Sequence, residues 1–382
     1  MSKNFTLMKR EKLYRAGTVG LTLLAITLRC LMIPFTNYDT DGYARWYDYI
    51  ATHGISNALG TNFAIYTPPY LYLLSFATLA EQFIPALVAI KVIPILFDLI
   101  NALIIYKILR LEYTAGYFPA FAASIFLLAP TVMLNSAFWG QIDSLYTCFL
   151  LLATFCILTE RPIPAMLAYG ISMSVKAQAI CLAPFLIMMA FKKKIPWHAF
   201  GLIPLTYLAM MLPAIFAGRS VADVTTIYLG QANAMQIPSV NSPNWYIFVP
   251  QSAYSVSTLI GFGVAILALG IWVAIYSHRN FALHTETLLV AALASVALTP
   301  FLLPKMHDRY FYPADVFSLA LALYVPRFWF VPLTYQVISL AAYSVFLFGV
   351  PPQEPLILGT ILNTAIIAHI LWIQHRTFTL EK

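Results

Sequence analysis

Charged residues are scarce in this chain of 382 residues. Asp, Glu, Lys and Arg together make up 10% of the sequence, whereas soluble domains carry about a quarter. Hydrophobic residues make up 61%, and the mean hydropathy is +0.79. These values exclude an ordinary soluble domain. They predict an all-α polytopic membrane protein that forms one integral membrane domain over residues 1–382.

Cysteine is rare, and internal repetition is absent. The four cysteines lie within or at the ends of apolar runs, without the spacing of a metal site or a disulfide framework. They are interpreted as small residues that face lipid or the core. The cysteines are Cys30, Cys148, Cys156 and Cys181. No repeat relates the two halves of the chain, although many secondary transporters are built from such repeats.

Acidic residues are fewer than basic ones, 15 against 22, and the formal net charge is +7. The Lys and Arg residues stand mostly in short connections between apolar runs, where they set membrane orientation and do not indicate nucleic-acid binding. The triple lysine Lys192–Lys194 is the firmest cytoplasmic anchor. The basic start of the chain is also placed in the cytoplasm, because the apolar run 16–35 after it is too long for a cleaved signal peptide.

Threading from that start predicts about twelve transmembrane helices with both termini cytoplasmic. The first outer loop, 36–87, is expected to hold two helices that lie along the membrane surface. These surface helices are expected at 41–52 and 70–83. A second long outer loop is expected at 218–253. Only 28 residues, 164–191, remain for spans five and six. Half-helices that meet near a cavity at Lys176 are therefore predicted.

Nearly every dense polar cluster falls on the non-cytoplasmic face of this topology. Such an asymmetry predicts an active site at one membrane surface. The clusters are Tyr38–Asp41, Gln141–Asp143, Lys176–Gln178, Asn241–Trp245 and Lys305–Tyr310. By contrast, three charged residues lie inside spans, where we expect them to pair with neighbouring helices or to snorkel to the membrane interface. These are Arg29, Lys91 and Asp98.

The first cluster offers two carboxylates just beyond the first span. Asp39 is a candidate general base toward a hydroxyl. Asp41 is the second catalytic candidate, and its alternative role is to cap a helix that starts at Gly42. An Asp-x-Asp triplet also occurs in metal-dependent transferases that use nucleotide sugars, but those donors are cytoplasmic and this loop is outside. No cofactor is required for certain, and a divalent metal is left open.

Basic residues suggest a phosphate site. An ammonium group at a helix break is costly unless it meets an anion, which favours a phosphate partner for Lys176 over snorkelling. The segment 305–313 places three basic side chains beside aromatic rings, and this arrangement suits a phosphate leaving group. Its alternative is a charged loop with snorkelling cations.

Polar residues of the remaining loops are candidates for binding sugar or acceptor. Gln141 and Asp143 are interpreted as ligands of sugar hydroxyls or of a cation, or else as a turn followed by a helix start. Asn241, Asn244 and Trp245 suit hydrogen bonding and ring stacking with a sugar, although a turn-rich loop has the same composition. The full candidate set is Gln141, Asp143, Gln178, Asn241, Asn244, Trp245, Asp308 and Tyr310.

Six motifs in order resemble the GT-C glycosyltransferases, in particular the bacterial and archaeal branch related to the GPI-anchor mannosyltransferases and other polyprenyl-phosphate-mannose-dependent enzymes. The motifs begin at Tyr38, Tyr66, Trp139, Val175, Asn241 and Met306, and they read YDTDGYARW, YTPPYLY, WGQIDS, VKAQ, NSPNW and MHDRY. The resemblance covers about residues 20–325. It implies a multi-span enzyme with interfacial helices in its first outer loop.

The resemblance also implies roles for individual residues. Asp39 matches the acidic residue that serves as base, and Asp41 is the less favoured substitute. Lys176 and Arg309 hold the donor phosphate, with His307 assisting. The family more often has Glu where this chain has Asp308. At Thr67 it often has tyrosine or another bulky residue.

The expected activity is transfer of a hexose, mannose favoured, from a polyprenyl-phosphate donor to a hydroxyl of a lipid or glycan acceptor on the non-cytoplasmic face, with inversion. The favoured location is the plasma membrane of a prokaryote, or the endoplasmic reticulum if the source is eukaryotic. The rival is a transporter or flippase of a lipid-linked sugar. That rival predicts ionisable residues near mid-membrane and two related halves.

Overall fold

Helices account for nearly all the regular structure of this computed structural model, as the composition predicts. Residues 2–279 and 282–377 are described; residues 1, 280–281 and 378–382 of the expected single domain lie outside the description. The α-helices are α1 (Ser2–Met32), α2 (Tyr38–His53), α3 (Ile55–Leu59), α4 (Pro68–Thr78), α5 (Ala86–Leu109), α6 (Phe118–Phe126), α7 (Pro130–Met133), α8 (Asp143–Leu158), α9 (Pro162–Val175), α10 (Ala183–Phe191), α11 (Leu202–Phe216), α12 (Val221–Ala234), α13 (Tyr254–His278), α14 (Thr285–Leu302), α15 (Tyr312–Tyr324), α16 (Phe330–Phe348) and α17 (Gln353–Thr377). The shorter elements are the π-helix η1 (Leu134–Phe138), the 3-10 helices η2 (Ala177–Leu182), η3 (Trp197–Gly201), η4 (Trp245–Phe248), η5 (Gln251–Ala253) and η6 (Pro326–Phe328), and the strands β1 (Ser239–Val240) and β2 (Met306–His307).

Within the described residues, seven helices are long and apolar enough to cross a membrane. They are α1, α5, α11 with η3, α13 with η5, α14, α16 with η6, and α17. The pair α6 and α7–η1 is bent by 58° and makes an eighth if it counts as one span. The other predicted crossings fall on shorter helices: α8, α9, α10 with η2, and α15. The structure thus gives an all-α membrane protein, while the count of twelve spans stays a prediction.

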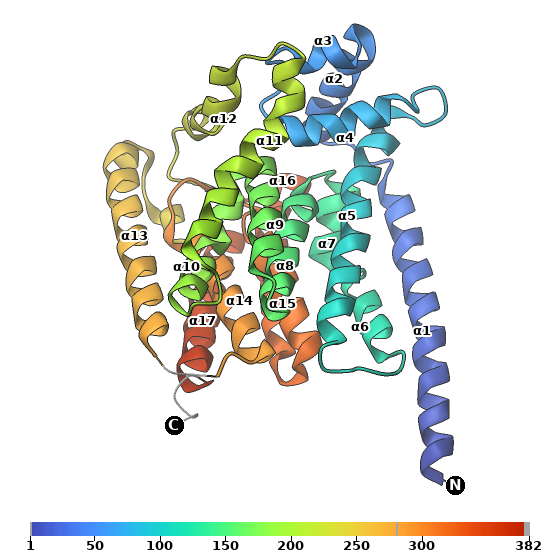
Figure 1. The fold of residues 1–382 in the computed structure, drawn as a ribbon. Helices are drawn as coiled ribbons and strands as arrows, with labels where there is room; N and C mark the ends of the chain where they lie inside the picture. Colours follow the sequence, from blue (N-terminus) through green and yellow to red (C-terminus); the bar gives the residue numbers. More distant parts are fainter. Residues whose placement is uncertain (1, 280–281, 378–382) are drawn as a thin grey trace.

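The two ends of the molecule differ in architecture. In Figure 1, α1 begins and α17 ends at the same end of the helical bundle, whereas α2, α3, α4 and α12 gather at the opposite end. The predicted first outer loop is therefore largely helical, and α12 occupies much of the predicted loop 218–253. Two expected boundaries shift, because the helices begin at Tyr38 and Pro68, not at 41 and 70.

Asn37, not Asp41, is the N-cap of α2. The Asn37 side chain accepts from the backbone N–H groups of Asp39 and Thr40, and the Thr40 hydroxyl completes a capping box with the Asn37 backbone N–H. The Asn37 Nδ2 also donates to the Trp139 carbonyl at 3.0 Å. The N-cap interpretation of Asp41 was wrong because an asparagine four residues earlier supplies the same acceptor in a better position.

The helix break predicted at Lys176 is present. α9 ends at Val175, Lys176 has extended backbone (φ −148°, ψ 137°), and the 3-10 helix η2 follows before α10. Thr67 supports the break, because its hydroxyl donates to the Val175 carbonyl at 2.8 Å. The extended residue turns its side chain out of the helical path and toward the neighbouring α8.

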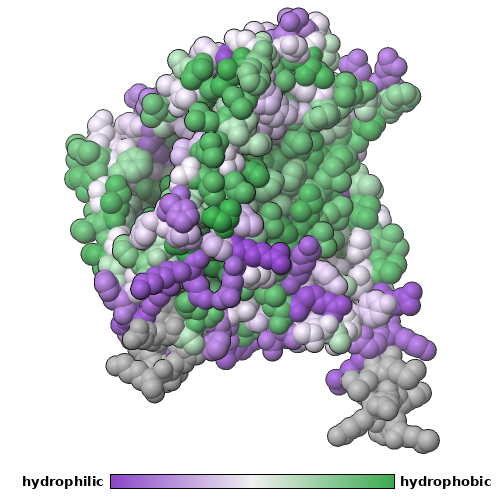
Figure 2. All heavy atoms as spheres, viewed as in Figure 1, coloured by the Kyte–Doolittle hydropathy of each residue, from purple (hydrophilic) through white to green (hydrophobic). Residues whose placement is uncertain are grey.

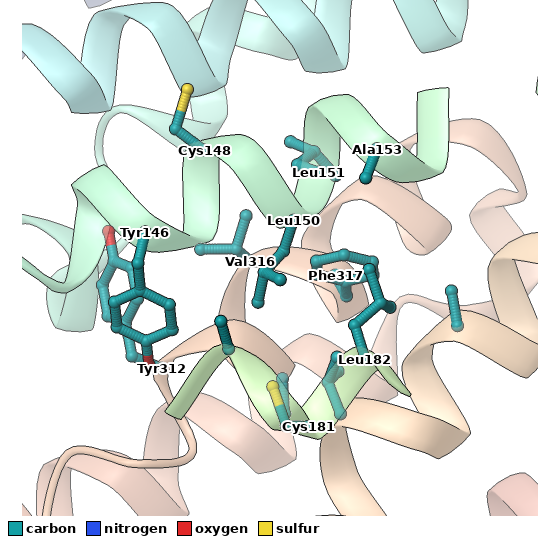
Figure 3. Close-up of a cluster of buried hydrophobic side chains, with 14 of the residues drawn as sticks. Tyr146, Cys148, Leu150, Leu151, Ala153, Cys181, Leu182, Tyr312, Val316 and Phe317 are labelled. Atoms are coloured by element: carbon teal, nitrogen blue, oxygen red, sulfur yellow. The ribbon is translucent and has the colours of Figure 1, made fainter. Parts of the chain in front are cut away.

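Helix α8 forms the centre of the bundle. In Figure 3, Leu150 of α8 lies near Val316 and Phe317 of α15, with Leu182 of η2 beside them. All four side chains are buried. Because lipid tails are as apolar as these side chains, close packing and interhelical hydrogen bonds hold such a helix in place more than transfer from water does.

Small hydroxyl residues supply those hydrogen bonds and fix the neighbours of α8. Ser144 of α8 donates to the Pro94 carbonyl of α5 at 2.9 Å, and Ser172 of α9 donates to the Tyr146 carbonyl of α8 at 2.7 Å. Ser295 of α14 donates to the Cys181 carbonyl of η2 at 2.8 Å. These contacts set the relative positions of the α8 start and the Lys176 break.

The charged residues inside the spans find partners. The Arg29 guanidinium forms an ion pair with Asp98 at 2.9 Å, and Ser136 donates to the same Asp98 oxygen. The Lys91 ammonium donates to the carbonyls of Phe35 and Phe138 at 2.5 and 2.8 Å. Pairing with neighbouring helices, the first of the two expected fates, is therefore confirmed.

The outer surface of the bundle is apolar over its middle. Figure 2 shows hydrophobic residues covering much of the central face, with hydrophilic residues gathered toward the lower end. Helix α13 illustrates the pattern, since Leu259, Ile266 and Leu267 are all more than half exposed. Exposed apolar side chains on this scale are expected of a surface that faces lipid. Of the four cysteines, all of them free, three are buried and Cys30 is exposed.

Candidate functional site

Four segments that are distant in sequence meet near the end of the bundle that carries α2. They are the first turn of α2, the turn 139–143 before α8, the break at Lys176, and the loop 307–310 between β2 and α15. Hydrogen bonds and ion pairs join them into one cluster. Four of the five polar clusters predicted from the sequence thus contribute to one place.

Asp39 sits in the first turn of α2 and is half-buried. Its Oδ2 accepts from the Trp139 indole Nε1–H at 2.8 Å and from the Gln141 side-chain amide at 2.6 Å. The positive end of the α2 dipole also stabilises a negative charge there. Asp41 is exposed, and its backbone N–H closes the first turn on the Asn37 carbonyl. Of the two acidic candidates, the structure brings Asp39 into the cluster and leaves Asp41 outside.

Lys176 is already paired with a carboxylate. Its Nζ lies 2.7 Å from Asp143 Oδ1, and both side chains are almost fully buried. Asn135 donates to the other Asp143 oxygen at 2.9 Å, while the Tyr66 ring lies 5.2 Å from the ammonium. The predicted partner of Lys176 was a phosphate, and the partner in the structure is Asp143. This pairing was missed because it depends on how α8 packs against α9.

Arg309 is the second cation of the cluster. Its guanidinium lies 5.4 Å from the centre of the Trp139 ring, and its Nη1 is 3.4 Å from Asp308 Oδ1. Its Nε is 3.7 Å from Asp143 Oδ2, too long for a hydrogen bond, and is a buried donor without a partner. An unsatisfied guanidinium N–H is a ready donor to an anion.

The two residues that precede this cation, His307 and Asp308, differ in how burial shifts their pKa values. Burial raises the pKa of the Asp308 carboxyl to about 7, partly offset by Arg309. Burial, together with the nearby cations Arg309 and Lys176, lowers the pKa of His307 to about 3. His307 is therefore a neutral ring at physiological pH. The prediction of three basic side chains in 305–313 thus overcounts the cations by one.

Gln141 links Asp39 to a group of tyrosines. Its Oε1 accepts from the hydroxyls of Tyr43 at 3.0 Å and Tyr66 at 3.5 Å, while its amide donates to Asp39. The side chain is fully buried. Gln141 therefore orients the Asp39 carboxylate, and both its amide nitrogen and its oxygen have partners.

Gln178 and Tyr310 form a pair on the other side of Lys176. The Gln178 amide donates to the Tyr310 hydroxyl, and the Gln178 Oε1 is a buried acceptor without a partner. Both residues line the cavity described next. An unused carbonyl oxygen of this kind is suited to accept from a hydroxyl of a bound ligand.

A cavity of about 670 Å³ adjoins the cluster. Its polar end is formed by Lys176, Gln178, His307, Arg309 and Tyr310. Its other walls are mainly apolar and come from the Phe63–Tyr66 segment, η2, α12, α13 and the end of α14. A cavity with cations at one end and apolar walls is complementary to an amphipathic anion. Asp39, Asp143 and Asp308 do not line it.

Two lining residues of the apolar wall also face outward. Ile180 of η2 and Phe262 of α13 are 46% and 41% exposed, on a face of the bundle that is otherwise apolar. Lys305 lines the same cavity, and its ammonium donates to the Ala232 carbonyl and to the Tyr254 hydroxyl. The cavity therefore has apolar walls beside the lipid-facing surface and a polar end within the bundle.

The cluster 241–245 does not join the site. The Asn244 side chain donates to the carbonyls of Pro300 and Leu303 and accepts from the Tyr246 backbone N–H, so it holds the loop in place. Trp245 is half exposed and lies against Phe248. Asn241 has φ 54° and forms a backbone bridge with His307. The Asn244 amide is thus used to hold the loop, and its expected sugar contacts stay a prediction.

The segment 239–241 still contacts the site through the backbone. Strands β1 and β2 pair in parallel, Ser239 with Met306 and Val240 with His307. This pairing fixes the start of the loop that carries Asp308 and Arg309. The role of the segment is thus to position the cluster.

Sequence reasoning singled out no role for several residues that complete the cluster. They are Tyr43, Tyr66, Asn135, Trp139 and Tyr146. Tyr43, Tyr66 and Trp139 belong to the motifs quoted above, and their place in those motifs could have singled them out. No sequence pattern marks Asn135 as a site residue, because it lies in the π-helix η1 inside an apolar run.

Comparisons with known proteins leave the site to be interpreted from its geometry. No protein-family model matches the chain, and no curated protein matches it. Among the described residues, no group of three or more His, Cys, Asp or Glu side chains is placed to hold a metal ion.

Proposed function

We propose that this protein is a membrane glycosyltransferase of the GT-C type with twelve membrane crossings. It transfers a hexose, mannose favoured, from a polyprenyl-phosphate donor to an acceptor hydroxyl of a lipid or glycan. The reaction takes place at the non-cytoplasmic surface, in the plasma membrane if the source is prokaryotic. One observation carries the proposal: a carboxylate and two cations stand in one cluster beside a cavity whose walls are apolar.

The cavity suits both the charged phosphate and the apolar chain of the proposed donor. A polyprenyl-phosphate sugar is a singly charged phosphodiester with a long apolar chain. Lys176 and Arg309 supply positive charge at the polar end of the cavity, and Ile180 and Phe262 extend its apolar wall toward the lipid-facing surface. The free Nε–H of Arg309 and the neutral ring of His307 add hydrogen-bond capacity for phosphate oxygens.

Asp39 is the group best placed to act as base. In the proposed step, Asp39 takes the proton of the acceptor hydroxyl as its oxygen attacks the anomeric carbon. The bond from that carbon to the phosphate oxygen breaks, and the electron pair leaves on the phosphate. Lys176 and Arg309 offset the added negative charge, and a single displacement inverts the configuration. Because Asp39 lies outside the cavity lining, the acceptor approaches from another side than the donor.

The first test compares Asp39→Asn with Asp41→Asn in purified protein reconstituted in liposomes. The donor is a polyprenyl-phosphate mannose, and the acceptor is the sugar hydroxyl of octyl mannoside. Asp39→Asn should lower the transfer rate by about two to four orders of magnitude, the usual contribution of a general base. Asp41→Asn, two residues away and exposed, should keep the wild-type rate.

A transporter of lipid-linked sugars is the competing function, and the buried pair Arg29–Asp98 is the observation that favours it. The same liposomes separate the two. Movement of intact donor across the bilayer without release of polyprenyl phosphate would establish the transporter. Sugar transfer or release without such movement would establish the transferase. Full transfer by Asp39→Asn would remove the base assignment.

A further inference from the structure

Asp308 is the least compensated acid of the cluster. Its side chain is 3% exposed, and its one ion pair among the described residues is the 3.4 Å contact with Arg309 Nη1. Asp143, by comparison, lies 2.7 Å from Lys176 and accepts a further hydrogen bond from Asn135. Asp39 is half-buried and accepts two hydrogen bonds. A buried carboxylate with one long ion pair depends heavily on that partner.

Anions outnumber cations around Asp308 before any ligand binds. The three carboxyl groups of the cluster, Asp39, Asp143 and Asp308, face two cations, Lys176 and Arg309. Several ionisable groups interact electrostatically with Asp308 or with Arg309. They are Asp39 and Tyr43 of α2, Tyr66 before α4, Asp143 of α8, Lys176 at the helix break, Tyr343 of α16, and the loop residues His307, Arg309 and Tyr310. Among the described residues of the cluster, Lys176 and Arg309 are the two cations, while the ammonium of Lys305 at the cavity wall donates to the Ala232 carbonyl and the Tyr254 hydroxyl.

An anionic ligand on Arg309 removes support from Asp308 in two ways. The phosphate oxygens compete for the guanidinium, and they bring a further negative charge into the buried cluster. Removing the partner from a buried ion pair is strongly unfavourable, so the group takes up a proton in place of staying charged. Protonation also turns the Asp308 carboxyl into an O–H donor.

We propose that binding of the anionic donor is coupled to uptake of one proton from solvent by Asp308, so that the phosphate is held beside a neutral carboxyl group. The inference rests on the phosphate-binding site of the proposed function. It adds that this site recognises a single negative charge together with a proton. Asp308 is thus a positioning residue, which acts on the donor through Arg309.

The coupling has a defined pH dependence. Burial raises the pKa of Asp308 in the free protein to about 7, and a bound anion raises that pKa further. Below pH 6 the carboxyl is already protonated and donor affinity is flat. Above pH 7 affinity falls, by at most about tenfold per pH unit for one proton. His307 stays neutral over this range because its pKa is lowered to about 3.

Isothermal titration calorimetry tests the coupling directly. The probe is decyl methyl phosphate, a phosphodiester with one negative charge at every pH used, so the ligand itself takes up no proton. Titrations at pH 7.5 in buffers of different ionisation enthalpy give the protons bound per ligand. Wild type should take up roughly half to three-quarters of a proton. Asp308→Asn should bind the probe with no uptake and with affinity independent of pH.

A matched control and three possible outcomes test whether anion binding is coupled to proton uptake by Asp308. Asp223→Asn, at a carboxyl that lines the same cavity, should keep the wild-type uptake. Binding by wild type without proton uptake overturns the proposal and leaves the phosphate site standing. Uptake that persists in Asp308→Asn overturns it as well. Failure of wild type to bind the probe at any pH removes the phosphate site itself, and the coupling with it. If Asp308→Asn does not fold, the proton uptake of the wild type and the pH dependence of its affinity still test the coupling.

Discussion

The ammonium of Lys176 lies 2.7 Å from the Asp143 carboxylate, with both groups buried. The cation at the polar end of the cavity is therefore neutralised before a ligand arrives. A phosphate that binds there shares Lys176 with Asp143, so affinity is limited by an internal competitor. In the proposed reaction, this competition weakens phosphate binding and so favours release of the product phosphate.

Removing that competitor should strengthen anion binding and weaken the fold. Asp143→Asn leaves Lys176 without a counter-charge, and breaking a buried pair in this way costs about 3–5 kcal/mol. We expect a lower unfolding temperature in detergent, a tighter Kd for decyl methyl phosphate, and recovery of stability when that ligand is present. Differential scanning fluorimetry and calorimetry measure these quantities.

The control for this prediction is Glu160→Gln. It breaks the exposed pair between Glu160 and Lys194, which contributes little because solvent screens it. Neither stability nor phosphodiester binding should change. A weaker Kd for Asp143→Asn would contradict the competition and would assign Asp143 a supporting role in the phosphate site.

The apolar wall of the cavity should discriminate donors by chain length. Phe262→Ser places a hydroxyl where the chain is expected to lie, so KM for a long-chain polyprenyl-phosphate sugar should rise several-fold while a short-chain analogue is unaffected. Leu267→Ser is the matched control, since Leu267 is exposed on the same helix α13 and does not line the cavity. Equal effects of the two substitutions would show that the chain binds elsewhere.

The turn at Gly140 should not accept a side chain. Gly140 has φ 78°, and a Cβ there would lie 2.9 Å from Thr40 Cγ2. Gly140→Ala should separate Trp139 and Gln141 from Asp39 and lower transfer activity by at least tenfold, with a loss of stability above 1 kcal/mol. Gly263→Ala, at a position with open space, should be neutral in both assays. Unchanged activity in Gly140→Ala would show that the hydrogen bonds on Asp39 are dispensable.

The sequence predicted the features that follow from chain length and burial cost. Twenty-eight residues between 164 and 191 cannot form two full spans, which located the break at Lys176. A buried lysine needs an anion, which singled out Lys176 as a candidate site residue. The identity of that anion did not follow, because Asp143 reaches Lys176 only through the packing of α8 against α9.

Loop residues were predicted less well for a different reason. Asn244 has the composition of a sugar ligand, yet its amide binds the carbonyls that α14 leaves free at its end. The same asparagine suits either task, and only the position of α14 decides between them. Asp41 was predicted as a helix N-cap, but Asn37 is the N-cap of α2. The two residue types cannot be told apart by composition, because both accept the same backbone hydrogen bonds.

Asn37 performs two tasks with the two ends of one amide. Its oxygen caps α2, and its nitrogen donates to the Trp139 carbonyl. An aspartate would cap the helix equally well but would point an acceptor at that carbonyl. Capping alone would accept asparagine or aspartate at position 37. Holding the Trp139 indole beside Asp39 requires the asparagine, because only its amide can donate to the Trp139 carbonyl. Under the proposed mechanism, variation at position 37 among homologous chains would therefore report on the position of the proposed base, even though residue 37 does not line the cavity.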